Sequence, residues 1–276
     1  MVLNEEKYEL MVHSHNQSSL LGELPLTGAN YVTSGGSVLT PSRELRDLGV
    51  LVSENLSWRA HYVKLTTRGR RMAQWVLGVF SSRDQELMVS LYKTLVRSTM
   101  EYCSPVWCPQ MVSDIQLLES VQRRFTASVA GQKELNYWER LKSLGLMSLQ
   151  RRRERYTVLH MHKTLHETVP NEVGVAFYRT SRHGLKAVLP DLSRVKSKRC
   201  ASLYASSFGS VGPRLWNCLP REIREIENLD LFKATLDRFL RTVPDLPPTP
   251  GYPTQNWNSL TDWCSGTDKI NEAVQH

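Results

Sequence analysis

The stretch LLESVQRRFTASVAG, Leu117–Gly131, predicts an amphipathic helix with two arginines in its middle. Apolar side chains recur along it at helical spacing, at Leu117, Leu118, Val121, Phe125 and Val129. At about 100° per residue, Arg123 points nearly opposite Val121, and Arg124 lies at the flank of the apolar face. Cations in such positions face water, an acidic partner protein or phosphate.

Helical patterns continue on both sides of this stretch. Upstream, SSRDQELMVSLYKTLVRSTMEY opens with a capping box of Ser82 and Gln85. A second box, Ser113 with Gln116, precedes the opening stretch. Downstream, ELNYWERLKSLGL predicts another helix. The middle of the chain is therefore expected to be a helical bundle.

A fourth helix, SLQRRRERYTVLHMHKTLHE, is capped by Ser148 and is unusually basic at its start. Three arginines crowd its first turn, where the helix dipole disfavours cations by a few tenths of a kcal/mol. A phosphate docked on that turn would relieve the cost, and Glu154 would relieve part of it. The arginines of this helix are Arg151, Arg152, Arg153 and Arg155.

The two ends of the chain have different patterns. Short strands are expected in the first sixty residues, at Tyr8–Ser14, at Leu48–Val52 and as a hairpin across Tyr31–Thr40. Residues 167–200 read as a connection, and Trp216 lies in an apolar patch after it. LDLFKATLDRFL predicts an amphipathic helix. Five prolines in residues 244–253 then predict an extended segment and a poorly ordered tail.

Charge is concentrated in the middle of the chain. The net charge is +8, and residues 64–163 hold 17 Lys and Arg against 8 Asp and Glu. A polyanion partner is one interpretation, and a solvated face that keeps the protein in solution is the other. Aromatic residues lie among these cations, but the spacing of most of them places them with the leucines.

Several classes of protein are disfavoured. No apolar run approaches the ~20 residues that a membrane-spanning helix needs, so we expect no membrane partner. The N-terminal MVLNEEKYEL has no apolar core of a secretory signal. The five scattered cysteines are expected to be reduced thiols in an intracellular protein, in the nucleus or the cytoplasm.

The sequence also lacks the residue patterns that are typical of metal-dependent chemistry. Two-metal polymerases and nucleases need neighbouring carboxylates, and no two Asp residues are adjacent in this sequence. His160, His162 and His166 have helical spacing for a metal, but HMHKTLHE lacks the His-Glu-x-x-His pattern. Cys103 and Cys108 flank SPVW, which suits a buried turn better than a zinc clip. We therefore predict no cofactor in this chain.

Seven segments in a fixed order resemble the C-terminal part of the polyprotein of non-LTR (LINE-type, Jockey-like) retrotransposons. They extend from about residue 3 to residue 263, with gaps similar to those of the family. The matching stretches are LNEEKYEL, RDLGVLVSENLSWRAHY, LYKTLVRSTMEYCSPVWCP, DIQLLESVQRRFTASVAG, LNYWERLKSLGLMSLQRRRER, PRLWNCLPREI and LDLFKATLDRFL.

The resemblance implies the end of the palm, the thumb and the C-terminal region of a reverse transcriptase, an RNA-directed DNA polymerase. Lys7 would then lie near the incoming nucleotide. The helices from Arg59 to about Glu167 would be the thumb, which grips an RNA–DNA or DNA duplex by its backbone. A thumb holds any sequence, so phosphate contacts should dominate. The expected contact residues are Lys7, Arg123, Arg124, Arg151, Arg152, Arg153 and Arg155.

The chain departs from the family in a way that affects mechanism. The catalytic Asp-Asp turn, the fingers, most of the palm and the endonuclease all precede these segments in the family. We therefore expect a fragment that is inactive alone, since the Mg²⁺ site would belong to the missing palm. A palm fragment supplied in trans could complete it. The alternatives are a non-catalytic helical domain that binds protein and a non-functional truncated product.

The sequence thus predicts an α+β, mainly α fold in four parts. Residues 1–62 form the palm-end β segment, and residues 63–168 form the helical thumb-like domain. Residues 169–245 form a C-terminal region that ends in an amphipathic helix. Residues 246–276 form a Pro-rich, disordered tail.

Overall fold

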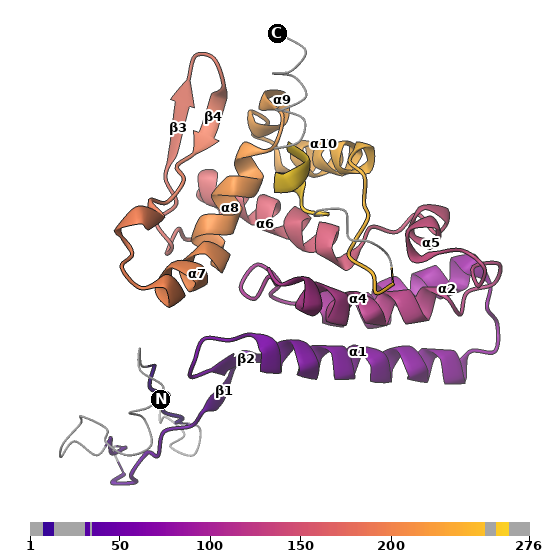
Figure 1. The fold of residues 1–276 in the computed structure, drawn as a ribbon, viewed down its shortest axis with the longest axis horizontal. Helices are drawn as coiled ribbons and strands as arrows, with labels where there is room; N and C mark the ends of the chain where they lie inside the picture. The colour runs from indigo at the N-terminus through magenta and orange to yellow at the C-terminus, as the bar shows by residue number, and fades with distance from the viewer. Residues whose placement is uncertain (1–7, 14–30, 34, 252–257, 265–276) are drawn as a thin grey trace. The chain divides into compact units, whose positions relative to one another are not determined.

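The computed structural model of the chain describes residues 8–13, 31–33, 35–251 and 258–264. The fold is α+β and mainly α, as expected, with two small antiparallel sheets (Figure 1). The chain forms two compact units, Met1–Lys64 and Leu65–His276. The division falls within the first helix, close to the expected end of the β segment at residue 62.

The first unit contains one regular hairpin. Strand β1 (Glu44–Asp47) pairs with β2 (Val50–Ser53), with Asp47 opposite Val50. The turn between them needs two residues with positive φ, and Leu48 (43°) and Gly49 (92°) supply them. The strand expected at Leu48–Val52 therefore begins two residues later, because its first two residues form the turn.

The other strands expected in this unit are reduced to single bridges. Within Tyr31–Thr40, Val32 pairs with Val38 in the antiparallel sense, which agrees with the expected hairpin. In the Tyr8–Ser14 stretch, Leu10 forms one isolated parallel bridge with Pro41 and no continuous strand among the residues described there. Proline cannot donate to a ladder, so the pairing stops at this point.

The first half of the second unit is helical. Ser148 caps its last helix as expected, because the Ser148 hydroxyl accepts a hydrogen bond from the Arg151 N–H. The expected capping boxes at Ser82 and Ser113 are wrong, since Asp84 caps α2 and α4 begins at Val112 without a side-chain cap. The helices are α1 (Arg59–Val79), α2 (Gln85–Leu91), the π-helix η2 (Tyr92–Arg97), α3 (Ser98–Glu101), α4 (Val112–Thr126), α5 (Tyr137–Ser143) and α6 (Leu149–Leu165).

The second half contains elements that the sequence did not reveal. A hairpin lies within residues 167–200, which were expected to be a connection, and Trp216 lies on a helix. The amphipathic helix at LDLFKATLDRFL is confirmed as α10. The elements are β3 (Phe177–Thr180), β4 (Gly184–Ala187), the 3₁₀ turn η3 (Leu192–Arg194), α7 (Lys198–Ser206), α8 (Phe208–Asn217), α9 (Arg221–Arg224) and α10 (Leu229–Thr242).

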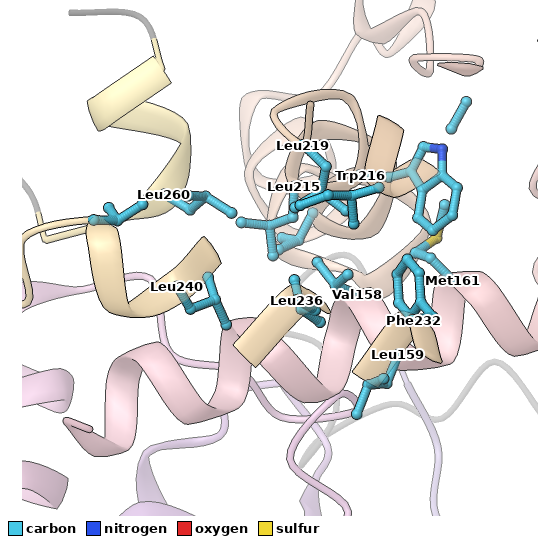
Figure 2. Close-up of a cluster of buried hydrophobic side chains, with 14 of the residues drawn as sticks. Val158, Leu159, Met161, Leu215, Trp216, Leu219, Phe232, Leu236, Leu240 and Leu260 are labelled. Carbon is cyan, nitrogen blue, oxygen red and sulfur yellow. The ribbon is translucent and has the colours of Figure 1, made fainter. Parts of the chain in front are cut away.

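Helices α6, α8 and α10 share one hydrophobic core (Figure 2). Trp216 of α8 stacks on Phe232 of α10, with ring centroids 5.9 Å apart. A Cβ on Gly212 would lie 2.7 Å from the Met161 sulfur, so glycine lets α8 approach α6 closely. The expected domain boundary at residues 168–169 therefore separates elements that are packed together.

The segment after α10 is folded where the structure describes it, which corrects the expected disordered tail. Pro247, Thr249, Asn258 and Leu260 are buried. Pro247 offers only a carbonyl, and the Trp138 indole N–H donates to it at 2.9 Å. A side chain far away in the sequence thus supplies a hydrogen bond to the backbone of this proline-rich segment.

Helices α1 and α4 approach each other at Gly69. A Cβ there would lie 2.5 Å from the sulfur of Met100 and 3.3 Å from Cγ1 of Val121. Met100 and Val121 are both fully buried, so neither can move aside without repacking. By contrast, a Cβ on Gly78 of the same helix would have no atom within 4 Å.

These two glycines predict opposite effects of the same substitution. Gly69→Ala should lower the free energy of unfolding by about 1–3 kcal/mol through overpacking. Gly78→Ala should leave it unchanged or raise it by up to about 1 kcal/mol, because alanine favours the helix. Urea unfolding of both variants measures the difference. Equal effects would contradict the close approach at Gly69.

Candidate nucleic-acid interface

The arginines of α6 are largely inside the protein, and Arg151 is the clearest case. Its side chain is 1% exposed. It donates to Glu154 at 3.1 Å and to the carbonyls of Pro244 and Asn258 at 3.0 and 2.9 Å. Arg151 therefore ties α6 to the segment that follows α10, and it cannot reach an external phosphate.

Arg152 and Arg155 are half-buried and are also engaged. Arg152 Nε and Nη2 both donate to the Glu101 carboxylate. Arg152 Nη2 also donates to the Tyr156 hydroxyl at 2.7 Å. Arg155 pairs with Asp237 of α10 in the same two-pronged way, with one contact at 2.8 Å. Such paired forks join α6 to α3 and to α10.

Arg153 is as buried as Arg151 but has far weaker contacts. Its guanidinium lies 4.0 Å from Glu119, at the limit of an ion pair. Apart from a side-chain hydrogen bond with Cys108, its three nitrogens have no hydrogen-bond partner among the residues that the structure describes. The Cys108 thiol lies close by; burial raises its pKa to about 11, and the Arg153 charge acts in the opposite direction.

These positions correct the expectation that four arginines project from α6 toward phosphate. The three arginines in the first turn of α6 are unfavourable for the helix dipole, and an acidic side chain of the same chain offsets them. The Asp245 carboxylate lies at this helix end and accepts from the Ser148 N–H and hydroxyl, both at 2.7 Å. A carboxylate at a helix N-terminus is stabilising. Asp245 thus occupies the place where a phosphate was expected. Lys7 lies outside the described residues.

The two arginines of α4 remain available. Arg124 is exposed and Arg123 is half-buried. In the described ranges of the chain neither side chain forms an ion pair. Both lie next to Ser120 on the surface of α4, one turn further along the helix, because they follow it by three and four residues.

Helix α1 presents a second set of cations beside them. Arg68 and Arg71 are exposed, and Trp75, one turn after Arg71, is 55% exposed. At about 100° per residue these three side chains lie within an arc of about 60°. The opposite face of α1, which includes Leu65, Gly69, Ala73 and Val76, is buried.

Arg70 links the two helices. Its Nη2 donates to the Ser120 hydroxyl of α4 at 2.9 Å. Burial first, and the Arg124 charge second, lower the pKa of Arg70 from its ordinary value. Like charges are thus held close together on this part of the protein. We call the five residues Arg68, Arg70, Arg71, Arg123 and Arg124 the α1–α4 basic surface.

Three of these residues were missed by sequence reasoning. The signal was present, because the sequence between Glu54 and Asp84 holds six Lys or Arg and no Asp or Glu. Clustered arginines such as those at 151–153 are easier to see than cations spaced along a helix face. The spacing of the cations along α1, together with the absence of acids between Glu54 and Asp84, was the better indicator of an exposed basic surface.

Comparison of the chain with protein-family models, with curated proteins and with solved structures gives no match. Within the described residues, no cluster of three or more His, Cys, Asp or Glu has the arrangement of a metal site. No helix in that same part of the chain has the length and apolar character needed to span a membrane.

Arg151 and Arg153 offer a matched pair for stability measurements. Arg151→Met breaks a buried, hydrogen-bonded network and should lower the free energy of unfolding by about 3–5 kcal/mol. Arg153→Met should cost at least about 2 kcal/mol less, because the contacts of Arg153 are a long ion pair with Glu119 and a weak hydrogen bond with the Cys108 thiol. Urea unfolding of both variants tests this difference, and equal losses would contradict the contacts described for Arg153.

Proposed function

We propose that this chain is the C-terminal part of a LINE-type reverse transcriptase and that it binds nucleic-acid duplexes by their backbone, without reading sequence. The order of the seven sequence segments supports the family. The α1–α4 basic surface carries the proposed activity. The proposal assigns the chain to the inside of the cell, in keeping with its five free cysteines.

The main observation is that this surface gathers cations without neutralising them. Arg68, Arg71 and Arg124 are exposed, and none of them forms an ion pair within the described residues. By contrast, Arg151, Arg152 and Arg155 are all paired with acids. Cations that are held near one another without acids are suited to a polyanion such as a phosphate backbone.

Arginine is also the appropriate residue for this task. Its planar fork can bind two phosphate oxygens at once, and it keeps its charge at any physiological pH. Phosphate contacts fix the position of a protein on a duplex and carry no sequence information. Trp75 adds an exposed aromatic ring on the same face of α1 as Arg71, which could pack against sugars or bases.

The proposal assigns no polymerisation step to this chain alone. Such chemistry uses two adjacent Asp carboxylates, and no two Asp residues are adjacent in its sequence. What remains is the positioning role of a thumb. A primer-extension reaction with a palm fragment added in trans would test whether that role can still serve catalysis.

The proposal predicts strong and sequence-independent salt dependence. Three or more phosphate contacts should make log K fall against log salt with a slope of roughly −3 or steeper on a labelled RNA–DNA duplex. Arg68→Gln with Arg71→Gln should flatten the slope by about two units, and so should Arg123→Gln with Arg124→Gln. The loss of affinity should be the same for duplexes of unrelated sequence.

A control variant separates this surface from net charge. Lys196→Gln with Lys198→Gln removes the same charge from an exposed part of the chain near α7. This variant should keep the wild-type slope within about half a unit. If it flattens the slope as much as the other two double variants, or if the wild type binds without salt dependence, the α1–α4 basic surface is not the binding site.

A further inference from the structure

The β3–β4 hairpin of the second unit has one edge that the protein closes and one that it leaves open. Strand β4 packs against α8 and α9, and Figure 1 shows β3 on the outer side of the hairpin. The hydrogen bonds of single backbone groups show the same difference between the two edges.

The outer edge of β4 is capped by side chains of α8 and α9. The Asn217 side-chain amide accepts from the Ala187 N–H at 2.9 Å and donates to the Ala187 carbonyl at 2.8 Å, as a neighbouring strand would. Arg224 donates to the carbonyls of Leu185 and His183. A strand cannot be added on this side without breaking these bonds.

The ladder between the two strands shows which backbone groups of β3 face outward. The Val188 N–H donates to the Ala176 carbonyl at 2.8 Å, so these two residues form a hydrogen-bonded pair. Directly opposite pairs in an antiparallel ladder alternate between bonded and non-bonded. Phe177 and Arg179 therefore belong to non-bonded pairs, and their N–H and carbonyl groups point away from β4.

These outward groups of Phe177 and Arg179 are left open. No hydrogen bond from the described part of the chain ends on either N–H or either carbonyl. The protein does cap Val175, two residues earlier, because the Asn171 side chain accepts from its N–H at 2.9 Å and donates to its carbonyl at 2.8 Å. Donors and acceptors at strand spacing can accept a further strand.

The hairpin that carries this edge is basic. Residues 176–188 include Arg179, Arg182 and Lys186 and no Asp or Glu. Arg179 is 65% exposed and pairs with Glu225 at 3.3 Å. Arg182 and Lys186 form no ion pair within the described ranges. A strand added beside β3 would lie in a positive potential, which favours acidic side chains.

We propose that the β3 edge binds an extended acidic peptide segment of another protein, which adds as a strand beside Phe177 and Arg179. A peptide strand offers carbonyls to the open N–H groups and N–H groups to the open carbonyls. The phosphates of a nucleic acid could accept from the N–H groups, but they have no donor for the carbonyls. A second copy of this chain would place the cations of two β3 strands side by side, which is unfavourable.

This inference goes beyond the proposed nucleic-acid binding, because it uses none of the five residues of the α1–α4 basic surface. It also gives a role to the difference between the two edges of the hairpin. The edge that Asn217 and Arg224 cap is fixed to the core, and the edge at Phe177 and Arg179 is available to a partner.

Fluorescence anisotropy of a dye-labelled peptide tests the proposal on the full chain. The probe is a seven-residue peptide of alternating glutamate and valine. One control peptide has glutamine in place of every glutamate. A second carries a methyl group on the backbone nitrogens of its three central residues, so that no two alternate residues both keep an N–H. The wild type should bind the probe at least about tenfold more tightly than either control.

Two substitutions at one position separate the backbone from the charge. Arg179→Pro removes the outward N–H and leaves the ladder bonds to β4 in place, as proline does on an edge strand. It should weaken binding of the probe by at least about tenfold. Arg179→Gln removes only the charge and should weaken binding by less than about fivefold. If Arg179→Pro fails to fold, the methylated and unmethylated peptides on the wild type still decide the outcome.

Four results would overturn the proposal. The first is no saturable binding of the probe at about 1 mM. The second is equal affinity for the methylated peptide, or equal losses in Arg179→Pro and Arg179→Gln, which would indicate attraction of anions without strand pairing. The third is displacement of the probe by an RNA–DNA duplex, which would indicate a nucleic-acid surface. The fourth is a dimer in sedimentation that Arg179→Pro abolishes, because a second copy would then occupy the edge.

Discussion

The second unit depends on the burial of charged side chains at the beginning of α6. Two arginines in one helical turn are almost completely enclosed, and a buried charge is tolerated only with partners. Arg151 finds them in Glu154 and in the carbonyls of Pro244 and Asn258. Asp245 completes the arrangement at the helix N-terminus. The chain after α10 therefore has to return to α6, about a hundred residues away in sequence.

This constraint divides the arginines of the chain into two groups with different roles. Those on α6 hold α3, α10 and the C-terminal segment through carboxylates and carbonyls. Those on α1 and α4 lie on helices whose apolar faces are satisfied by packing, so their charges remain outward. The net charge of +8 is thus not a property of one surface. A count of cations along the sequence cannot separate a structural arginine from one that is free to bind phosphate.

The sequence predicted what local rules determine. The Ser148 cap and the α10 helix follow from a polar cap and from apolar spacing, and both are present. Helix α8 was missed because Gly209, Gly212 and Pro213 disfavour helices locally. The packing of α8 nevertheless requires small residues, at Gly212 against Met161 of α6 and at Gly209 against Val173. The partners of Arg151 could not be foreseen for a related reason. They are backbone carbonyls, which every residue has, so no sequence pattern marks them.

The same return of the chain creates a cavity. Hydrogen bonds of Asp245 and Asn258 hold the segment after α10 against the beginning of α6, and the Pro247 carbonyl accepts from Trp138. A space remains between this segment, α4 and α6. Any ligand of that space would bind only the folded chain, because the segment, α4 and α6 are brought together only there. By linkage it would stabilise the packing of the C-terminal segment that forms one of its walls.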